Sequence, residues 1–92
     1  MYSRLMGGES RNYFIIPGPH KVLDCSGLLG PLPIIKTSMA IKEVEVRQVL
    51  QVITTDPGSP LDMLAWSRLT GNDLLDSREE AGKFVFYFQR VK

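Results

Sequence analysis

The stretch GLLGPLPIIK, from Gly27 to Lys36, has the composition of a helix start that could support chemistry. Pro31 and Pro33 suit the first turn of a helix, where the missing proline N–H groups remove no helical hydrogen bond. The free N–H groups and the dipole of a helix start attract an anion and lower the pKa of a cysteine thiol placed there. Because Gly30 precedes Pro31, the sequence predicts the backbone of such a site, with Gly30 as the N-cap and no reactive side chain.

Few other side chains could take part in chemistry. Cys25 is the single cysteine and His20 the single histidine, so neither an intrachain disulfide nor a zinc or iron–sulfur ligand set is expected. Cys25 lies five residues before Gly30 and could approach the helix start across the loop, although a cysteine at a strand end is usually an inert packing group. Asp24 and Asp56 are expected to brace turns, with an electrostatic effect on the site as the alternative. No metal and no cofactor is predicted.

Composition sets the class of protein. The 92 residues allow one small domain, and a formal net charge of +1 argues against a dedicated nucleic-acid binder. No apolar run approaches the ~20 residues of a membrane span. A lone cysteine fits a reducing compartment, so a cytoplasmic location is expected.

Four strands and two helices are predicted to position these residues. The β-period pattern and the turn residues predict strands over Lys21–Cys25, Gln48–Thr54, Asp73–Glu79 and Lys83–Val91. The helices are predicted over Pro31–Val44 and Pro60–Thr70. Two helices cannot cover both faces of such a sheet, so the order βαβαββ predicts an α/β (α+β) two-layer sandwich. Both helices would lie on one face of a four-stranded mixed sheet.

Capping residues mark the second helix. Ser59 followed by Asp62 fits a capping box, with Pro60 at the first helical position and Gly71 as a left-handed C-cap. Trp66 is expected to be a core residue.

The first helix carries two apolar faces. The residues expected to face the core are Ile34, Thr37, Ala40, Ile41 and Val44. Leu32, Ile35 and Met39 fall on the opposite side, among charged residues. Either another element covers this second face, for example the N-terminal segment, or it docks a partner protein. Residues 1–20 are predicted to be a leader, in which Tyr13–Ile16 could add an edge strand.

Residues 21–92 resemble the TusA/SirA family of sulfur-carrier proteins. The resemblance rests on VLDCSGLLGPLPIIKT (Val22–Thr37), TTDPGS (Thr54–Ser59), DMLAWSRLTGNDLL (Asp62–Leu75) and the final strand pair. It implies the same βαβαββ sandwich and a sulfurtransferase activity that relays persulfide sulfur between proteins. Routes served by the family include tRNA thiolation, sulfur oxidation and molybdenum-cofactor enzymes. The implied partners are DsrE/TusD-like or rhodanese-like sulfur donors and acceptors, without direct contact to nucleic acid or membrane.

The family holds the persulfide on the cysteine of a C-P-x-P motif. Here the matching residues are Gly30-Pro31-Leu32-Pro33, so both prolines match and Gly30 stands where the family has its cysteine. Three interpretations stay open. The chain is a carrier that has lost its acceptor, a non-catalytic paralogue that binds partners through Leu32, Ile35 and Met39, or a carrier in which Cys25 has taken over.

Overall fold

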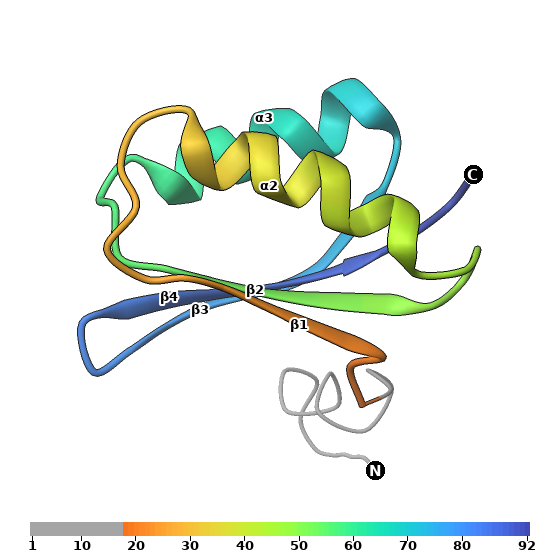
Figure 1. Cartoon of the computed structure of the whole chain (residues 1–92), viewed down its shortest axis with the longest axis horizontal. Coiled ribbons are helices and arrows are strands. Elements are labelled where there is room, and N and C mark those ends of the chain that lie inside the picture. The colour runs from red at the N-terminus through yellow and green to blue at the C-terminus, as the bar shows by residue number, and fades with distance from the viewer. Residues whose placement is uncertain (1–17) are drawn as a thin grey trace, which may run out of the picture.

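A computed structural model describes residues 18–92, and the predicted strand Tyr13–Ile16 lies outside this range (Figure 1). The elements in chain order are β1 (Lys21–Cys25), α2 (Leu32–Ala40), a 3₁₀ helix (Ile41–Glu43), β2 (Val49–Thr54), α3 (Ser59–Thr70), β3 (Asp73–Glu80) and β4 (Lys83–Gln89). The predicted order βαβαββ is confirmed. The limits of β1 are as predicted, and each other strand differs at one end by one or two residues, as is usual at element ends.

The sheet has the strand order β1-β2-β4-β3, with β1 parallel to β2 and both β2 and β3 antiparallel to β4. The connections β1-α2-β2 and β2-α3-β3 therefore join parallel strands and advance in the same direction across the sheet. Because such crossovers are right-handed, both helices fall on one face. Figure 1 shows α2 and α3 over the same face of the sheet, which confirms the two-layer sandwich.

The core lies between this face and the two helices. Alternate residues of β2 and β4 point toward the helices, and Phe86 and Phe88 are fully buried there. The Trp66 ring meets Phe88 edge-on, with ring centroids 4.9 Å apart, and its Nε1–H donates to Ser38 Oγ over 2.8 Å. Trp66 is thus a core residue, as predicted, and its polar atom ties α3 to α2.

The start and end of the first helix differ from the prediction. The N-cap is Pro31 rather than Gly30, and Gly30 lies in the preceding turn in the left-handed region, with φ +64°. The α-helix ends at Ala40 and tightens into the 3₁₀ turn, after which Val44 is extended, with φ −100° and ψ 157°. Such a tighter last turn is common at helix C-termini, and here it returns the Val44 side chain to the core.

The capping box predicted for the second helix is wrong. The N-cap is Gly58, without a side-chain hydrogen bond, and Ser59 is already helical. The Ser59 hydroxyl is buried and has no hydrogen-bond partner among residues 18–92. The side chain that accepts a hydrogen bond at this helix start is that of Asp56, whose Oδ1 accepts the Gly58 N–H over 3.0 Å. The other end follows the prediction, since Gly71 is left-handed (φ +82°) and its N–H caps Ser67 O over 2.9 Å.

In the part of the chain that the structure describes, no helix is long and apolar enough to cross a membrane. Within the same range, no three side chains of His, Cys, Asp or Glu come together in a way that could hold a metal ion.

Candidate functional site

Gly30 lies in an exposed turn between β1 and the start of α2. A Cβ atom built on Gly30 would meet no other atom within 4 Å, so there is open space above this position. The backbone itself is the constraint, because φ +64° is a conformation that glycine adopts freely and other residues adopt at a cost.

Side chains from distant segments hold this turn in place. The Gly30 N–H donates to Asp56 Oδ2 over 3.0 Å, and the Gly27 N–H donates to Thr55 Oγ1 over 2.8 Å. Closer in sequence, the Ser26 N–H donates to Asp24 Oδ1 over 2.9 Å. Asp24 and Asp56 therefore brace turns, as the sequence predicted. Side-chain and backbone hydrogen bonds from Ser26 also hold the pKa of Asp24 below its usual value.

The helix start offers fewer free N–H donors than the sequence suggested. Pro31 and Pro33 carry no N–H, and the Leu32 N–H points back to Leu29 O at 3.4 Å. The Gly30 N–H is taken by the Asp56 carboxylate. An anion arriving at this turn would thus have to displace a carboxylate of the chain itself. The expectation of an open anion site at the helix start is wrong in this respect.

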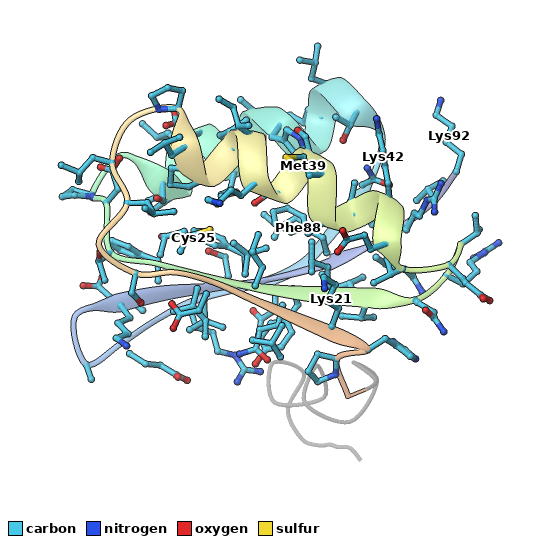
Figure 2. The ribbon with its side chains drawn as sticks, in the orientation of Figure 1. Lys21, Cys25, Met39, Lys42, Phe88 and Lys92 are labelled. Atoms are coloured by element: carbon cyan, nitrogen blue, oxygen red, sulfur yellow. The ribbon has the colours of Figure 1, made fainter. Side chains whose placement is uncertain are left out.

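Cys25 faces the interior. Its side chain is fully buried and belongs to the hydrophobic core, and Figure 2 shows its sulfur between the sheet and the helices. Burial raises the pKa of the Cys25 thiol, and the Lys36 ammonium opposes this rise. A buried thiol with a raised pKa is the opposite of a reactive cysteine, which is exposed and has a lowered pKa.

Apolar side chains are exposed beside Gly30 and along α2. The exposed fractions are 65% for Leu29, 43% for Leu32, 49% for Ile35 and 64% for Met39. We call these four residues the α2 patch. The helical spacing predicted that Leu32, Ile35 and Met39 lie on the side of the helix away from the core. It did not predict the exposure of Leu29. Leu29 lies in a loop, where no periodicity marks a residue as exposed or buried.

A groove of about 190 Å³ adjoins the α2 patch between α2 and β1, which is an edge strand of the sheet that residues 18–92 form. Its lining residues are Lys21, Val22, Leu23, Lys36, Met39, Ala40 and Glu43. An ion pair between Lys21 Nζ and Glu43 Oε1, 3.0 Å apart, joins β1 to the 3₁₀ helix. Figure 2 shows Met39 on the helix and Lys21 on the strand. The patch therefore continues into a shallow groove with charged residues on both sides.

The hydrogen bonds of Asp56 can be tested by substitution. An Asp56→Asn variant keeps one carbonyl acceptor and loses the charge, so one of the two backbone N–H groups loses its partner. We expect the unfolding free energy to fall by about 1–3 kcal/mol, and the Gly30 or Gly58 amide to exchange faster with solvent. Urea unfolding and hydrogen exchange measure these effects. Asp73→Asn, at an exposed strand end, is the control. Equal protection of both amides in Asp56→Asn and the parent chain would contradict the assignment.

Comparison with known proteins identifies the family of the chain. Residues 21–90 match the family described as Sulfurtransferase TusA. The chain is 47% identical to the sulfur carrier protein TusA of Allochromatium vinosum over 68 residues, which cover 74% of this chain and 90% of that protein. It is 43% identical to the putative sulfur carrier protein YrkI of Bacillus subtilis over 70 residues, which cover 76% of this chain and 93% of YrkI.

A solved structure shares the fold. The SirA-like protein of Desulfitobacterium hafniense superposes with a TM-score of 0.67 at 16% identity, covering 78% of this chain and 99% of that one. The fold, the matched family and the relatives lead to one conclusion: the chain belongs to the TusA family of sulfur carrier proteins.

Proposed function

We propose that this domain docks onto the proteins of a sulfur relay through the α2 patch and does not itself hold the persulfide. The observation that carries the proposal is a combination of two features: Gly30 is exposed and has no side chain, and exposed apolar residues run from Leu29 along α2. The bare Gly30 leaves the domain without a thiol that accepts sulfur at this position. The exposed apolar residues form a surface suited to binding another protein.

The chemistry of sulfur transfer supports the absence of an acceptor. A donor persulfide passes on its outer sulfur only when an acceptor thiolate reaches that sulfur atom. Gly30 offers no thiol, and the one cysteine of the chain, Cys25, is fully buried with a raised thiol pKa. Neither position can receive sulfur while the domain stays folded.

Backbone geometry favours an adaptor over a carrier that has simply lost its cysteine. Gly30 has a φ of +64°, which suits glycine and strains other residues. A turn adapted to glycine is more readily explained by a domain that works with glycine there. The partners expected from the family resemblance are DsrE/TusD-like and rhodanese-like proteins, in routes such as tRNA thiolation or sulfur oxidation.

Incubation with a low-molecular-mass persulfide, followed by intact-mass measurement, tests whether the folded chain accepts sulfur. We expect no gain of a sulfur atom by the native chain, whereas denaturant should expose Cys25 and permit modification. Persulfide formation on native Cys25 would overturn the proposal and show that this cysteine has taken over.

The docking half needs a binding measurement with a DsrE-type protein. Ile35→Asp should weaken binding by about tenfold or more, because a charge in a docking surface must be desolvated. Val46→Asp is a matched control, since Ile35 and Val46 are both 49% exposed and Val46 lies in the loop after the 3₁₀ helix. Equal affinities for the two variants would exclude the α2 patch as the docking surface.

A further inference from the structure

The outer edge of β1 carries backbone hydrogen-bonding groups that face no other strand of residues 18–92. In the sheet, β1 pairs with β2, and the two strands are parallel. The Gln48 C=O, just before β2, accepts the Arg90 N–H over 3.0 Å and so faces the β4 side. The next residue, Val49, accepts the His20 N–H over 2.8 Å and so faces β1. Because this direction alternates along a strand, the odd-numbered residues of β2 direct their N–H and C=O groups to β1.

The register of the two strands shows which groups of β1 point outward. Gln51 lies opposite Val22. The Gln51 N–H and C=O therefore bond to the residues on either side of Val22, as in any parallel ladder. Lys21 and Leu23 are thus directed to β2. The N–H and C=O groups of Val22 and Asp24 point the other way, to the outer edge, where a further strand can bond to them.

Apolar surface lies on both faces of the sheet along this edge. Leu23 and Met39 line the groove of about 190 Å³ between β1 and α2, and the Met39 side chain is 64% exposed. Figure 2 shows Met39 on the helix side of the sheet. Successive side chains of a strand point to opposite faces, so Val22, which is 54% exposed, faces away from the helices. An apolar strand laid along β1 would therefore meet apolar side chains on either face.

Tyr13–Ile16 has the composition and the position to fill this edge. The sequence YFII carries no charge, and aromatic and β-branched residues favour strands. Pro17 to His20 connect it to β1, a length within the roughly two to five residues of hairpin loops. Both prolines of the connection lie outside the segment, where their missing N–H groups remove no ladder hydrogen bond. The connection ends at a fixed point beside β1, because the Val49 N–H also donates to His20 Nδ1 over 3.0 Å.

We propose that Tyr13–Ile16 adds to the outer edge of β1 as an antiparallel fifth strand. Ile15 would pair with Val22 and Tyr13 with Asp24, each pair through two backbone hydrogen bonds. This register uses the outward groups of β1 and leaves Pro17 to His20 as the loop.

The same register directs the apolar side chains of the added strand. Opposite residues of an antiparallel pair share a face, so Phe14 would lie beside Leu23 and Ile16 beside Lys21, both toward the helices. Phe14 and Ile16 would then fill the groove next to Met39. Ile15 would pack beside Val22 on the other face of the sheet.

The added strand would cover the Met39 end of the α2 patch. A protein that docks there would have to displace Phe14 and Ile16 from the groove, so the segment would act as an internal competitor for the docking surface. This consequence rests on the proposed function, whereas the pairing with β1 does not depend on it.

Hydrogen exchange of the full chain tests the pairing. The Val22 and Asp24 amides should exchange slowly in the parent chain and about tenfold faster or more in Ile15→Pro, because proline removes the N–H at the centre of the added strand. Ser10→Pro, outside the segment, is the matched control and should exchange like the parent. The Leu23 amide, which bonds to β2, should stay protected in all three chains and so show that the sheet is intact. Equal exchange of Val22 and Asp24 in the parent and Ile15→Pro would overturn the proposal.

Nuclear Overhauser contacts test the register. The Hα atoms of an antiparallel pair approach most closely at residue pairs without hydrogen bonds, so the parent should show a contact between the Hα atoms of Phe14 and Leu23. Contacts of Tyr13–Ile16 with Tyr87, on the face of the sheet opposite the helices, would place the segment elsewhere and overturn the proposal. Cross-strand contacts in a different register would do the same.

A binding measurement with a DsrE-type protein tests the competition. A paired state that is about 90% populated lowers the apparent affinity about tenfold, so Ile15→Pro should bind more tightly than the parent by that order and Ser10→Pro should not. Equal affinities of parent and Ile15→Pro would overturn the competition. Absence of binding by every chain would contradict the proposed function, and the exchange result would still decide the pairing.

Discussion

A Gly30→Cys variant should carry one persulfide sulfur per chain where the parent chain carries none. The substitution restores the thiol of the family motif at a position that is exposed and open, since nothing lies within 4 Å of the added Cβ. With few free N–H donors at this helix start, we expect the α2 dipole to favour the thiolate only weakly and the Asp56 carboxylate to oppose it. Incubation with a persulfide donor and intact-mass measurement of the variant should show the added sulfur, and peptide mapping should place it on the introduced thiol.

Gly27→Cys is a matched control for this gain. Gly27 has φ +82° and Gly30 has φ +64°, and a Cβ at either residue meets nothing within 4 Å. Both variants therefore carry a similar backbone strain, about 1–2 kcal/mol for a side chain in the left-handed region. Both positions are also exposed. Only position 30 adjoins the helix start. If the two new cysteines react with persulfide at the same rate, the helix start contributes nothing to the chemistry.

The largest loss of stability is expected for Phe88→Ala. Phe88 is fully buried, with the Trp66 ring centroid at 4.9 Å and the Phe86 centroid at 6.2 Å. Truncation leaves a cavity between the sheet and the helices, which should reduce the free energy of unfolding by about 3–5 kcal/mol. Because a small domain has a total of only about 5–15 kcal/mol, this variant should lose a large part of its stability, and its midpoint in urea titration should fall accordingly.

Leu29→Ala serves as the comparison for this prediction. Leu29 is 65% exposed, so its truncation should change stability by no more than about 0.5 kcal/mol. The two variants together test whether the layer between Phe88 and Trp66 holds the helices on the sheet. Similar losses for Phe88→Ala and Leu29→Ala would contradict this account of the core.

Local patterns in the sequence were sufficient to predict the elements. The alternation in Gln48–Thr54 predicted a strand, and the structure has it as β2 (Val49–Thr54), inside the sheet between β1 and β4. The spacing in α2 separated the buried Thr37 and Ala40 from the exposed Ile35 and Met39. Periodicity carries this information because burial of one face acts on every residue of a helix or strand.

Contacts between distant residues could not be predicted in the same way. Asp56 reaches Gly30 across 26 positions and Thr55 reaches Gly27 across 28, and both bonds depend on how the two loops meet at the end of the sheet. The wrong capping box has the same cause. Ser59 fits the local motif, yet the two N–H groups of the predicted box donate to backbone carbonyls, Asp62 N–H to Gly58 O and Ser59 N–H to Asp56 O. The packing of α3 also buries the Ser59 hydroxyl.

For the candidate site, the sequence predicted that Gly30 has no reactive side chain. It did not predict that the Gly30 and Leu32 N–H groups are directed to acceptors within the chain. The sequence does contain a signal for the burial of Cys25. Cys25 is two residues after Leu23 on β1, so both point to the helix face. The exposure of Leu29 has no such signal, because a loop side chain has no periodic neighbours from which its direction follows.

The single carboxylate of Asp56 links the first turns of both helices. Its Oδ2 receives the Gly30 N–H ahead of α2, and its Oδ1 receives the Gly58 N–H at the N-cap of α3. A partner that reshapes the Gly30 turn would break the first of these bonds and leave the carboxylate held by the Gly58 N–H alone. The starts of the two helices therefore share one side chain, so truncation of the Asp56 side chain removes a hydrogen bond from both at once.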